Sequence, residues 1–300
     1  MELESGGSIF GSMSQTAVGS YILGFLRLIR FPNLVILVGA QYLTAVFLVG
    51  HPGEVWQYLS DPKLFFLALA TGLLAAAGYI INDYYDVKID YINRPDQVVV
   101  GKQFKRRWAM ALHTIFSITG VGIGLLIWWP IGVVNFLTAF SLWWYSNQLK
   151  RLPFVGNFMV SFLTAASIAI IALLYQEQMR LVLTFAGFAF SISLIREVIK
   201  DMEDLQGDAT FGCRTLPIVW GIPRTKWFLF VWILGFQATL IAQGIILEDK
   251  ILIGYFVALI VPMAYLLYRL YWADTQQEFG RLSTYCKGLM VIGILSMIFF

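Results

Sequence analysis

Six aspartates in the 300-residue chain form two copies of one pattern. The segments "DYYDVKID" (residues 83–90) and "DMEDLQGD" (residues 201–208) both read D-x-x-D-x-x-x-D, and each closes a long apolar run. On an α-helix, which turns by about 100° per residue, the three aspartates of one copy fall within an arc of about 60°. Asn82 lies beside the first arc. Gly207 could end the second helix early, in which case Asp208 lies on a loop.

Carboxylates aligned in this way repel one another, and each like-charged pair destabilises a helix by about 0.2–0.5 kcal/mol. A solvated acidic edge at the water line is one interpretation of each cluster. Two clusters of matched spacing, both interleaved with bases, favour a cation site instead. Carboxylate and amide oxygens suit Mg²⁺, which commonly shares its coordination shell with substrate phosphate. The candidate metal ligands are Asn82, Asp83, Asp86, Asp90, Asp201, Asp204 and Asp208.

Basic residues near both motifs could bind the phosphate. The strongest candidates lie at or beside an acidic motif or the end of an apolar run, and they are Arg94, Lys150, Arg196 and Lys200. Further candidates are Lys88, Lys102, Arg151 and Arg214. Acids, bases and an apolar interior together predict a diphosphate that is held by Mg²⁺ and bases, with its hydrocarbon inside the protein.

The elements that must position these residues are membrane helices. The chain is 59% hydrophobic and 13% charged, with a mean hydropathy of +0.73, whereas soluble domains are about a quarter charged. At about 20 apolar residues per crossing, the sequence predicts nine segments, at residues 31–50, 63–82, 108–128, 131–147, 157–175, 181–199, 227–247, 251–271 and 284–300. We therefore expect an all-α polytopic membrane protein, one bundle that arose by duplication of a four-helix unit.

Residues 17–300 are expected to form a single transmembrane domain behind an N-terminal tail, residues 1–16, that does not resemble a signal peptide. All but three of the 21 Lys and Arg residues fall on one side of the predicted topology; the exceptions are Lys63, Arg180 and Lys250. The positive-inside rule makes this side cytoplasmic. The N-terminus and both acidic motifs then face the cytoplasm, and the C-terminus lies outside.

Other chemistries find little support in the residues. Cys213 and Cys286 fall on the reducing side, and His51 and His113 stand apart from other metal-ligating residues, so we expect no disulfide, zinc or haem. Nucleic acid is not an expected partner. A membrane transporter of an anionic substrate is an alternative from another class, because duplicated bundles are common among transporters. Against it, the acids lie at the rim of the predicted bundle instead of the bilayer midplane.

Four segments together resemble the UbiA superfamily of intramembrane prenyltransferases. "NDYYDVKID" and "KDMEDLQGD" resemble its two Asp-rich motifs, "YSNQLKRLPFVGN" (residues 145–157) its Tyr/Lys segment, and "GDATFGCRTLP" (residues 207–217) its loop after the second motif. The resemblance extends over essentially the whole chain. One departure lies in "NRPDQVVVGK", where Asp96 and Gln97 replace a second basic residue; Lys102 could substitute for it.

This resemblance implies a helical bundle with a central cavity, in which a prenyl group passes from a polyprenyl diphosphate to a lipophilic acceptor. It implies two Mg²⁺ ions, one on Asn82, Asp86 and Asp90 and the other on Asp204 and Asp208, with Asp83 and Asp201 as ligands or close neighbours. The implied diphosphate-binding residues are Arg94, Lys102, Tyr145, Lys150, Arg196 and Lys200. The implied catalytic residues are Asp86, Asp90, Asp204, Asp208 and Lys150.

The acceptor is indicated by "REVIKDMEDLQGD" and "LKRLPFVGN", which are most similar to the digeranylgeranylglyceryl phosphate synthase branch. Its members alkylate the hydroxyl of a prenylglycerol phosphate, which implies ether lipid synthesis in a bacterial or archaeal cell membrane. Prenylation of aromatic acids for quinones, of the 4-hydroxybenzoate or dihydroxynaphthoate type, stays open. An alcohol nucleophile needs a base, and Glu197 and Asp201 lie on the right helical face, although pairing with Lys200 or Arg196 is their alternative role. The donor's chain length and the oligomeric state do not follow from the residues.

Overall fold

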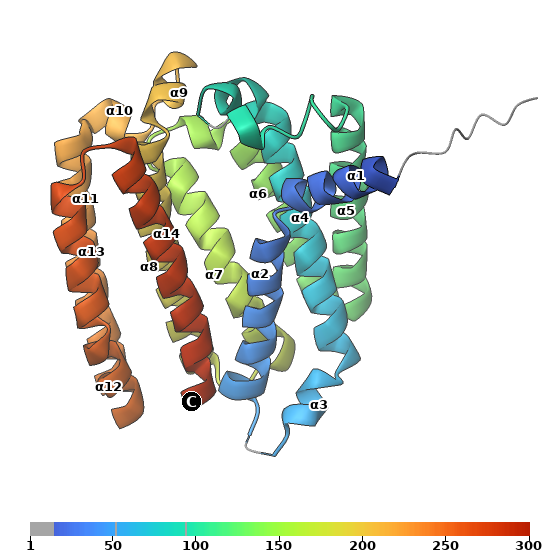
Figure 1. Ribbon diagram of the computed structural model, residues 1–300. Coiled ribbons are helices and arrows are strands. Elements are labelled where there is room, and N and C mark those ends of the chain that lie inside the picture. Colours follow the sequence, from blue (N-terminus) through green and yellow to red (C-terminus); the bar gives the residue numbers. More distant parts are fainter. Residues whose placement is uncertain (1–14, 52, 94) are drawn as a thin grey trace, which may run out of the picture.

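The computed structural model describes residues 15–51, 53–93 and 95–300, and these residues form helices and no β-strand (Figure 1). The long helices are α2 (Phe31–Leu43), α4 (Pro62–Asn93), α5 (Arg106–Ile127), α6 (Trp129–Asn147), α7 (Val155–Tyr175), α8 (Met179–Glu203), α11 (Ile222–Ile246), α12 (Lys250–Ala258), α13 (Ile260–Trp272) and α14 (Gln276–Ser296). The shorter elements are α1 (Gln15–Leu28), η1 (Thr44–Val49), α3 (Val55–Leu59), η2 (Pro95–Gln97), η3 (Leu149–Arg151), α9 (Leu205–Thr210), α10 (Leu216–Trp220) and η4 (Met297–Phe299). The predicted all-α class is confirmed, while most of the predicted tail lies outside the described residues.

The protein is an integral membrane protein. Eight helical stretches of the described chain are long and apolar enough to cross a bilayer. Each coincides with one of the nine predicted segments. The remaining segment, 131–147, corresponds to α6, a 19-residue helix that packs against α4 and α5 but is not among those eight. The count of nine crossings therefore stays a prediction.

Local signals in the sequence set the ends of several helices. α4 begins at Pro62 beside Asp61, whose carboxylate accepts a hydrogen bond from the Lys63 backbone N–H. α6 has a proline in its first turn, where a missing N–H costs nothing. α14 begins with a capping box between Thr275 and Glu278. These caps place the helix ends at the two faces of the bundle.

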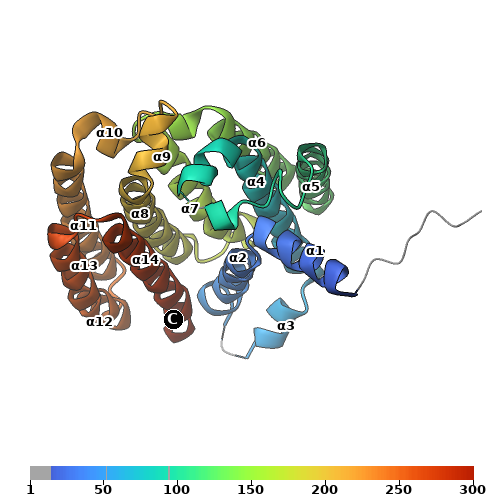
Figure 2. The ribbon, with the colours of Figure 1, turned by 45° about the horizontal axis from the view of Figure 1, so that its top comes forward.

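Six helices form a closed ring in which each packs against the next: α2, α4, α6, α7, α8 and α14, which returns to α2 (Figure 2). α5 packs outside the ring against α4 and α6, and α11 to α13 pack outside it near α8 and α14. α8 is the most deeply buried of the eight spans, and the main hydrophobic core follows it. The two helices that lead into the acidic motifs, α4 and α8, occupy opposite positions in this ring.

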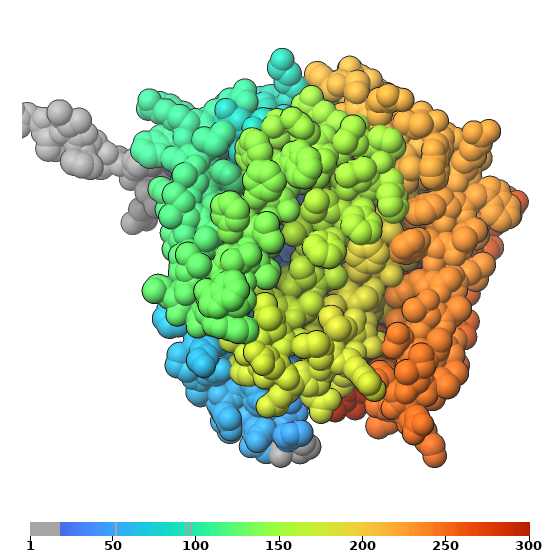
Figure 3. All heavy atoms as spheres, turned by 180° about the vertical axis from the view of Figure 1, so that it is seen from behind, coloured from blue at the N-terminus to red at the C-terminus, as the bar shows by residue number. Residues whose placement is uncertain are grey.

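The ring is not sealed on its rear side. Figure 3 shows a hollow between α6, in green, and α7, in yellow-green, with blue atoms of the N-terminal helices at its floor. Both acidic motifs lie at one end of the bundle, the top in Figure 1, together with η2, η3, α9 and α10. The C-terminus lies at the opposite end (Figure 1). The term motif end is used below for the end that holds both motifs.

Candidate active site

The first acidic motif lies on a single helix. α4 continues without a break to Asn93, two residues before Pro95, and a proline opposes helix at the residue that precedes it. Asn82 and the three aspartates that follow it therefore lie along one face of α4, and all four side chains are half-buried. The prediction that this motif is helical is confirmed.

The second motif departs from the regular helical arc. α8 ends at Glu203, Asp204 occupies the C-cap position, and α9 begins at the next residue. Asp201 therefore belongs to α8, whereas Asp208 belongs to α9. The prediction of one helix through all three aspartates is wrong. The alternative of an early helix end is correct, but the break precedes Gly207, and Asp208 lies on a short helix instead of a loop.

Asn93 joins the two motifs. Its side-chain oxygen accepts a hydrogen bond from the Gly207 backbone N–H at 3.0 Å, and its amide nitrogen donates to the Asp204 backbone oxygen at 3.4 Å. A Cβ atom at position 207 would lie 2.3 Å from that side-chain oxygen, so only glycine fits this contact. Asn93 was not predicted as a site residue. The sequence did contain a signal for it: a polar side chain at the last position of the motif helix, two residues before a proline.

Lys150 occupies the first acidic cluster. Its ammonium donates hydrogen bonds to the Asp86 carboxylate at 2.5 Å and to the Asn82 amide oxygen at 3.4 Å. The side chains of Lys150 and Asp86 are only 10% and 14% exposed, so water screens this ion pair weakly. η3, between α6 and α7, brings the lysine across to α4. The predicted proximity of this base to the first motif is observed.

Lys200 connects both motifs. It donates to the Asp204 carboxylate at 2.5 Å, and its charge also acts on Asp90 of α4 and on Asp208 of α9. Burial raises the pKa of the Asp208 carboxyl to about 7; the neighbouring Asp204 charge adds to the rise, and Lys200 opposes it. The charges of Asp86 and Lys150 also reach Asp208. Both acidic clusters and both lysines therefore form one electrostatic unit at the motif end.

Two further predicted metal ligands, Asp83 and Asp201, are also engaged by other side chains. Asp83 accepts a hydrogen bond at 3.0 Å from Arg30, which precedes α2 and stacks over the Tyr79 ring at 4.8 Å. Asp201 accepts one at 2.9 Å from the Asn157 amide on α7. Neither partner was predicted, because Arg30 and Asn157 lie far from the motifs in the sequence. These contacts fix the positions of both carboxylates.

The remaining predicted diphosphate-binding residues lie at different places in the structure. Tyr145, half-buried on α6, lies within electrostatic range of Asp86 and Asp201. Lys102 is exposed, donates to the Pro95 carbonyl at 2.7 Å and lies over a tyrosine ring, so it secures the loop after α4. Arg196 pairs with Glu197 at 2.5 Å on the side of α8 that faces α14. Arg94 lies outside the described residues.

The oxygen ligands that the two motifs offer suit a hard divalent cation. Asn82, Asp86, Asp90, Asp204 and Asp208 offer amide and carboxylate oxygens, the ligands that Mg²⁺ prefers. Among the described residues, no three acidic, histidine or cysteine side chains stand close enough together to hold a metal ion. Two ammonium groups, those of Lys150 and Lys200, bind the carboxylates instead. A metal ion at either motif would therefore compete with the lysine for the same carboxylate.

Comparison with known proteins assigns this arrangement to a family. The model of the UbiA prenyltransferase family matches residues 38–283, which is most of the chain and includes both acidic motifs. The chain belongs to the UbiA prenyltransferase family. The predicted resemblance is confirmed, and the protein is a membrane-embedded prenyltransferase. A transporter is thereby set aside.

Individual UbiA relatives agree in sequence and in fold. The chain is 33% identical, over 211 residues, to a digeranylgeranylglyceryl phosphate synthase from Methanospirillum hungatei; the match covers 69% of this chain and 72% of the relative. A solved structure described as a digeranylgeranylglyceryl phosphate synthase in membranes superimposes with a TM-score of 0.69 at 21% identity, over 94% of this chain and all of that one. The structure of a UbiA homolog from Archaeoglobus fulgidus bound to DMAPP and Mg²⁺ superimposes with a TM-score of 0.62 at 14% identity. The match covers 91% of this chain and 98% of that one.

Proposed function

We propose that the protein transfers a geranylgeranyl group from its diphosphate to the hydroxyl of geranylgeranylglycerol phosphate, a step of ether lipid synthesis. The observation that carries this proposal is the convergence of both acidic motifs with Lys150 and Lys200 at one end of an apolar bundle. The name of the Methanospirillum relative supports the acceptor. The DMAPP and Mg²⁺ bound to the Archaeoglobus homolog support an allylic diphosphate donor and a divalent metal.

The two acidic clusters support a proposal of two Mg²⁺ ions, one for each cluster. Asn82, Asp86 and Asp90 would hold one ion, and Asp204 and Asp208 the other. Bound Mg²⁺ would stabilise the negative charge that develops on the departing diphosphate.

The two lysines are placed to change partners when the donor arrives. Lys150 and Lys200 each bind a carboxylate through an ammonium group, and a diphosphate offers the same kind of oxygen with more charge. Each lysine would then bind diphosphate oxygens, and the hydroxyl of Tyr145 would add a hydrogen bond. Arg30 and Asn157 would keep Asp83 and Asp201 fixed while these partners exchange.

Transfer breaks the bond between the allylic carbon and the diphosphate oxygen and forms an ether bond to the acceptor oxygen. The acceptor hydroxyl loses its proton in the same process, and the diphosphate leaves with the electrons of the broken bond. Glu197 and Asp201 are the candidate acceptors of that proton; Glu197 pairs with Arg196, and Asp201 with Asn157. The apolar interior protects the allylic cation from water.

A panel of acceptors tests this function. Purified protein, labelled geranylgeranyl diphosphate and Mg²⁺ are incubated with geranylgeranylglycerol phosphate, 4-hydroxybenzoate or dihydroxynaphthoate in parallel. We expect the glycerol phosphate to be prenylated in preference to both aromatic acids. Robust product from an aromatic acid and none from the glycerol phosphate would assign the chain to quinone synthesis.

The orientation in the membrane is part of the same proposal. The excess of Lys and Arg on one side supports a cytoplasmic motif end, an N-terminus on that side and a C-terminus outside. Labelling of a single introduced cysteine in sealed vesicles tests it. A cysteine beside Lys102 should react only after the cytoplasmic side is made accessible.

A further inference from the structure

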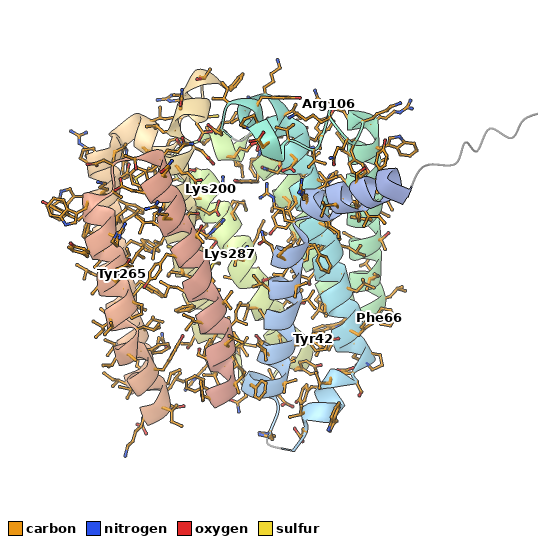
Figure 4. All side chains as sticks on the ribbon, viewed as in Figure 1. Tyr42, Phe66, Arg106, Lys200, Tyr265 and Lys287 are labelled. Atoms are coloured by element: carbon orange, nitrogen blue, oxygen red, sulfur yellow. The ribbon has the colours of Figure 1, made fainter. Side chains whose placement is uncertain are left out.

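A second group of bases gathers where α2, α8 and α14 meet. Lys287 of α14 donates a hydrogen bond at 2.6 Å to the side-chain oxygen of Asn33 on α2. It is half-buried. Arg30 caps the start of α2 about one turn before Asn33, and Arg196 lies on α8, which packs against α14. The positive charges of both arginines act on Lys287. Figure 4 labels Lys287 and Lys200 on this side of the bundle, both in its upper half. Three separate elements thus bring three cations together.

This arrangement is costly without an anion. Cations near one another in a partly buried site repel, and each loses hydration. Arg30 and Arg196 each pair with a carboxylate, Asp83 and Glu197, whereas the recorded partner of Lys287 is a neutral amide. The positive charge of Lys287, which neighbours two further cations, points to an anionic ligand at this place.

The group borders the cluster around the acidic motifs, because Arg196 stands about one helical turn from Lys200 on α8, but the two side chains pair with different carboxylates. Lys150 and Lys200 bind Asp86 and Asp204 directly. Arg196 and Lys287 instead lie along the boundary of α8 with α14, where the charge of Arg196 also acts on Cys286. Arg30 links the two groups, because its partner Asp83 stands one helical turn from Asp86 on α4. An anion at this second group would therefore lie next to the donor's diphosphate.

We propose that Lys287, Arg196 and Arg30 bind the phosphate of the acceptor. A phosphate dianion offers several oxygens to ammonium and guanidinium groups, and charge-assisted hydrogen bonds to it would relieve the repulsion among the three cations. This assignment rests on the proposed function, because it requires an acceptor that has an anionic head. It also explains how the protein distinguishes two phosphorylated lipids. The diphosphate of the donor binds the metals and lysines, and the single phosphate of the acceptor binds the three bases.

Kinetics with two acceptors test the assignment. Lys287→Met is compared with wild type on geranylgeranylglycerol phosphate and on the phosphate-free alcohol geranylgeranylglycerol. We expect the acceptor KM to rise about tenfold or more for the phosphate, which corresponds to the loss of one charged contact. The KM of the alcohol and the donor KM should stay unchanged, and Lys287→Arg should restore the phosphate KM. These are KM values and KM ratios, so a reduced folded fraction does not affect them.

Lys226→Met is the matched control. Lys226 stands near the start of α11, pairs with Asp274 at 3.0 Å and lies over the Phe279 ring of α14, but it is not among the charges that act on Lys287. We expect its KM values to match wild type. An unchanged phosphate KM in Lys287→Met, or equal rises for the phosphate and the alcohol, would overturn the assignment. Failure of wild type to use the glycerol phosphate at all would instead overturn the proposed function.

Binding without Mg²⁺ provides the second measurement. Calorimetry with EDTA present should detect geranylgeranylglycerol phosphate on wild type, because three side chains and no metal hold its phosphate. The same titration with Lys287→Met should show at least about tenfold weaker binding. Binding that needs Mg²⁺, or that is equal in the two proteins, would contradict a second anion site.

Discussion

The ammonium of Lys150 lies 2.5 Å from a carboxylate oxygen of Asp86, with the Asn82 amide oxygen 3.4 Å away. A base from the loop between α6 and α7 thus occupies the face of α4 on which the first metal ion is proposed. Lys200 has the same relationship to Asp204 at the second motif. The two lysines offset part of the negative charge of the acidic clusters, which helps so many carboxylates remain together near the membrane.

Asp86→Asn and Asp204→Asn should each reduce prenyl transfer by about a hundredfold or more, because each removes a charged oxygen from a proposed metal site. Stability should change little, since each substitution loses an ion pair to a lysine and also relieves repulsion among neighbouring carboxylates. Initial rates with geranylgeranyl diphosphate and melting in EDTA measure the two effects. Activity within about tenfold of wild type in both variants would contradict the two-metal assignment.

Lys150→Met should tighten Mg²⁺ binding and weaken donor binding together. The ammonium competes with a metal ion for Asp86 and Asn82, so its removal frees both oxygens. The donor loses a cation for its diphosphate, and we expect its KM to rise about tenfold or more. Mg²⁺ titration without donor, followed by donor kinetics, separates the effects, with Lys226→Met as the control. Weaker Mg²⁺ binding in Lys150→Met would contradict the competition.

Gly207→Ala should displace α9 and lower activity strongly. Its Cβ would lie 2.3 Å from the Asn93 oxygen and 2.5 Å from the other two amide atoms, and α9 holds Asp208. Gly187→Ala is the matched control, because a Cβ there meets nothing within 4 Å on α8. The control should hold its activity and gain up to about 1 kcal/mol of stability from helix propensity. Equal activity in the two variants would show that the Asn93 contact does not position the second motif.

Mg²⁺ affinity should rise with pH between about 6 and 8. The raised pKa of Asp208, about 7, means that its carboxyl holds a proton at pH 6 and must release it before it can bind a metal. Apparent affinity should therefore increase by up to about tenfold per pH unit below 7 and level off above it. Calorimetry at several pH values measures this, and Asp208→Asn should flatten the profile. An affinity that is constant from pH 6 to 8 would exclude proton competition at Asp208.

Hydropathy and residue spacing determined the class of this protein. Long apolar runs specify membrane helices because a bilayer leaves the backbone few other ways to satisfy its hydrogen bonds. All nine predicted runs coincide with helices, and the matched motifs led to the UbiA family. The chemistry of the first motif also followed from the sequence, since Asn82 and Asp86 share one unbroken helix. These properties are local, so a window of residues contains them.

Partnerships between distant residues were decided only by the packing of the helices. The break at Asp204 and the contact of Gly207 with Asn93 both depend on which helix faces which. Lys287 meets Asn33 because α14 closes the ring against α2. A charged side chain in the sequence has many possible partners, and the free energy that selects one comes from burial and geometry that exist only after the ring has formed.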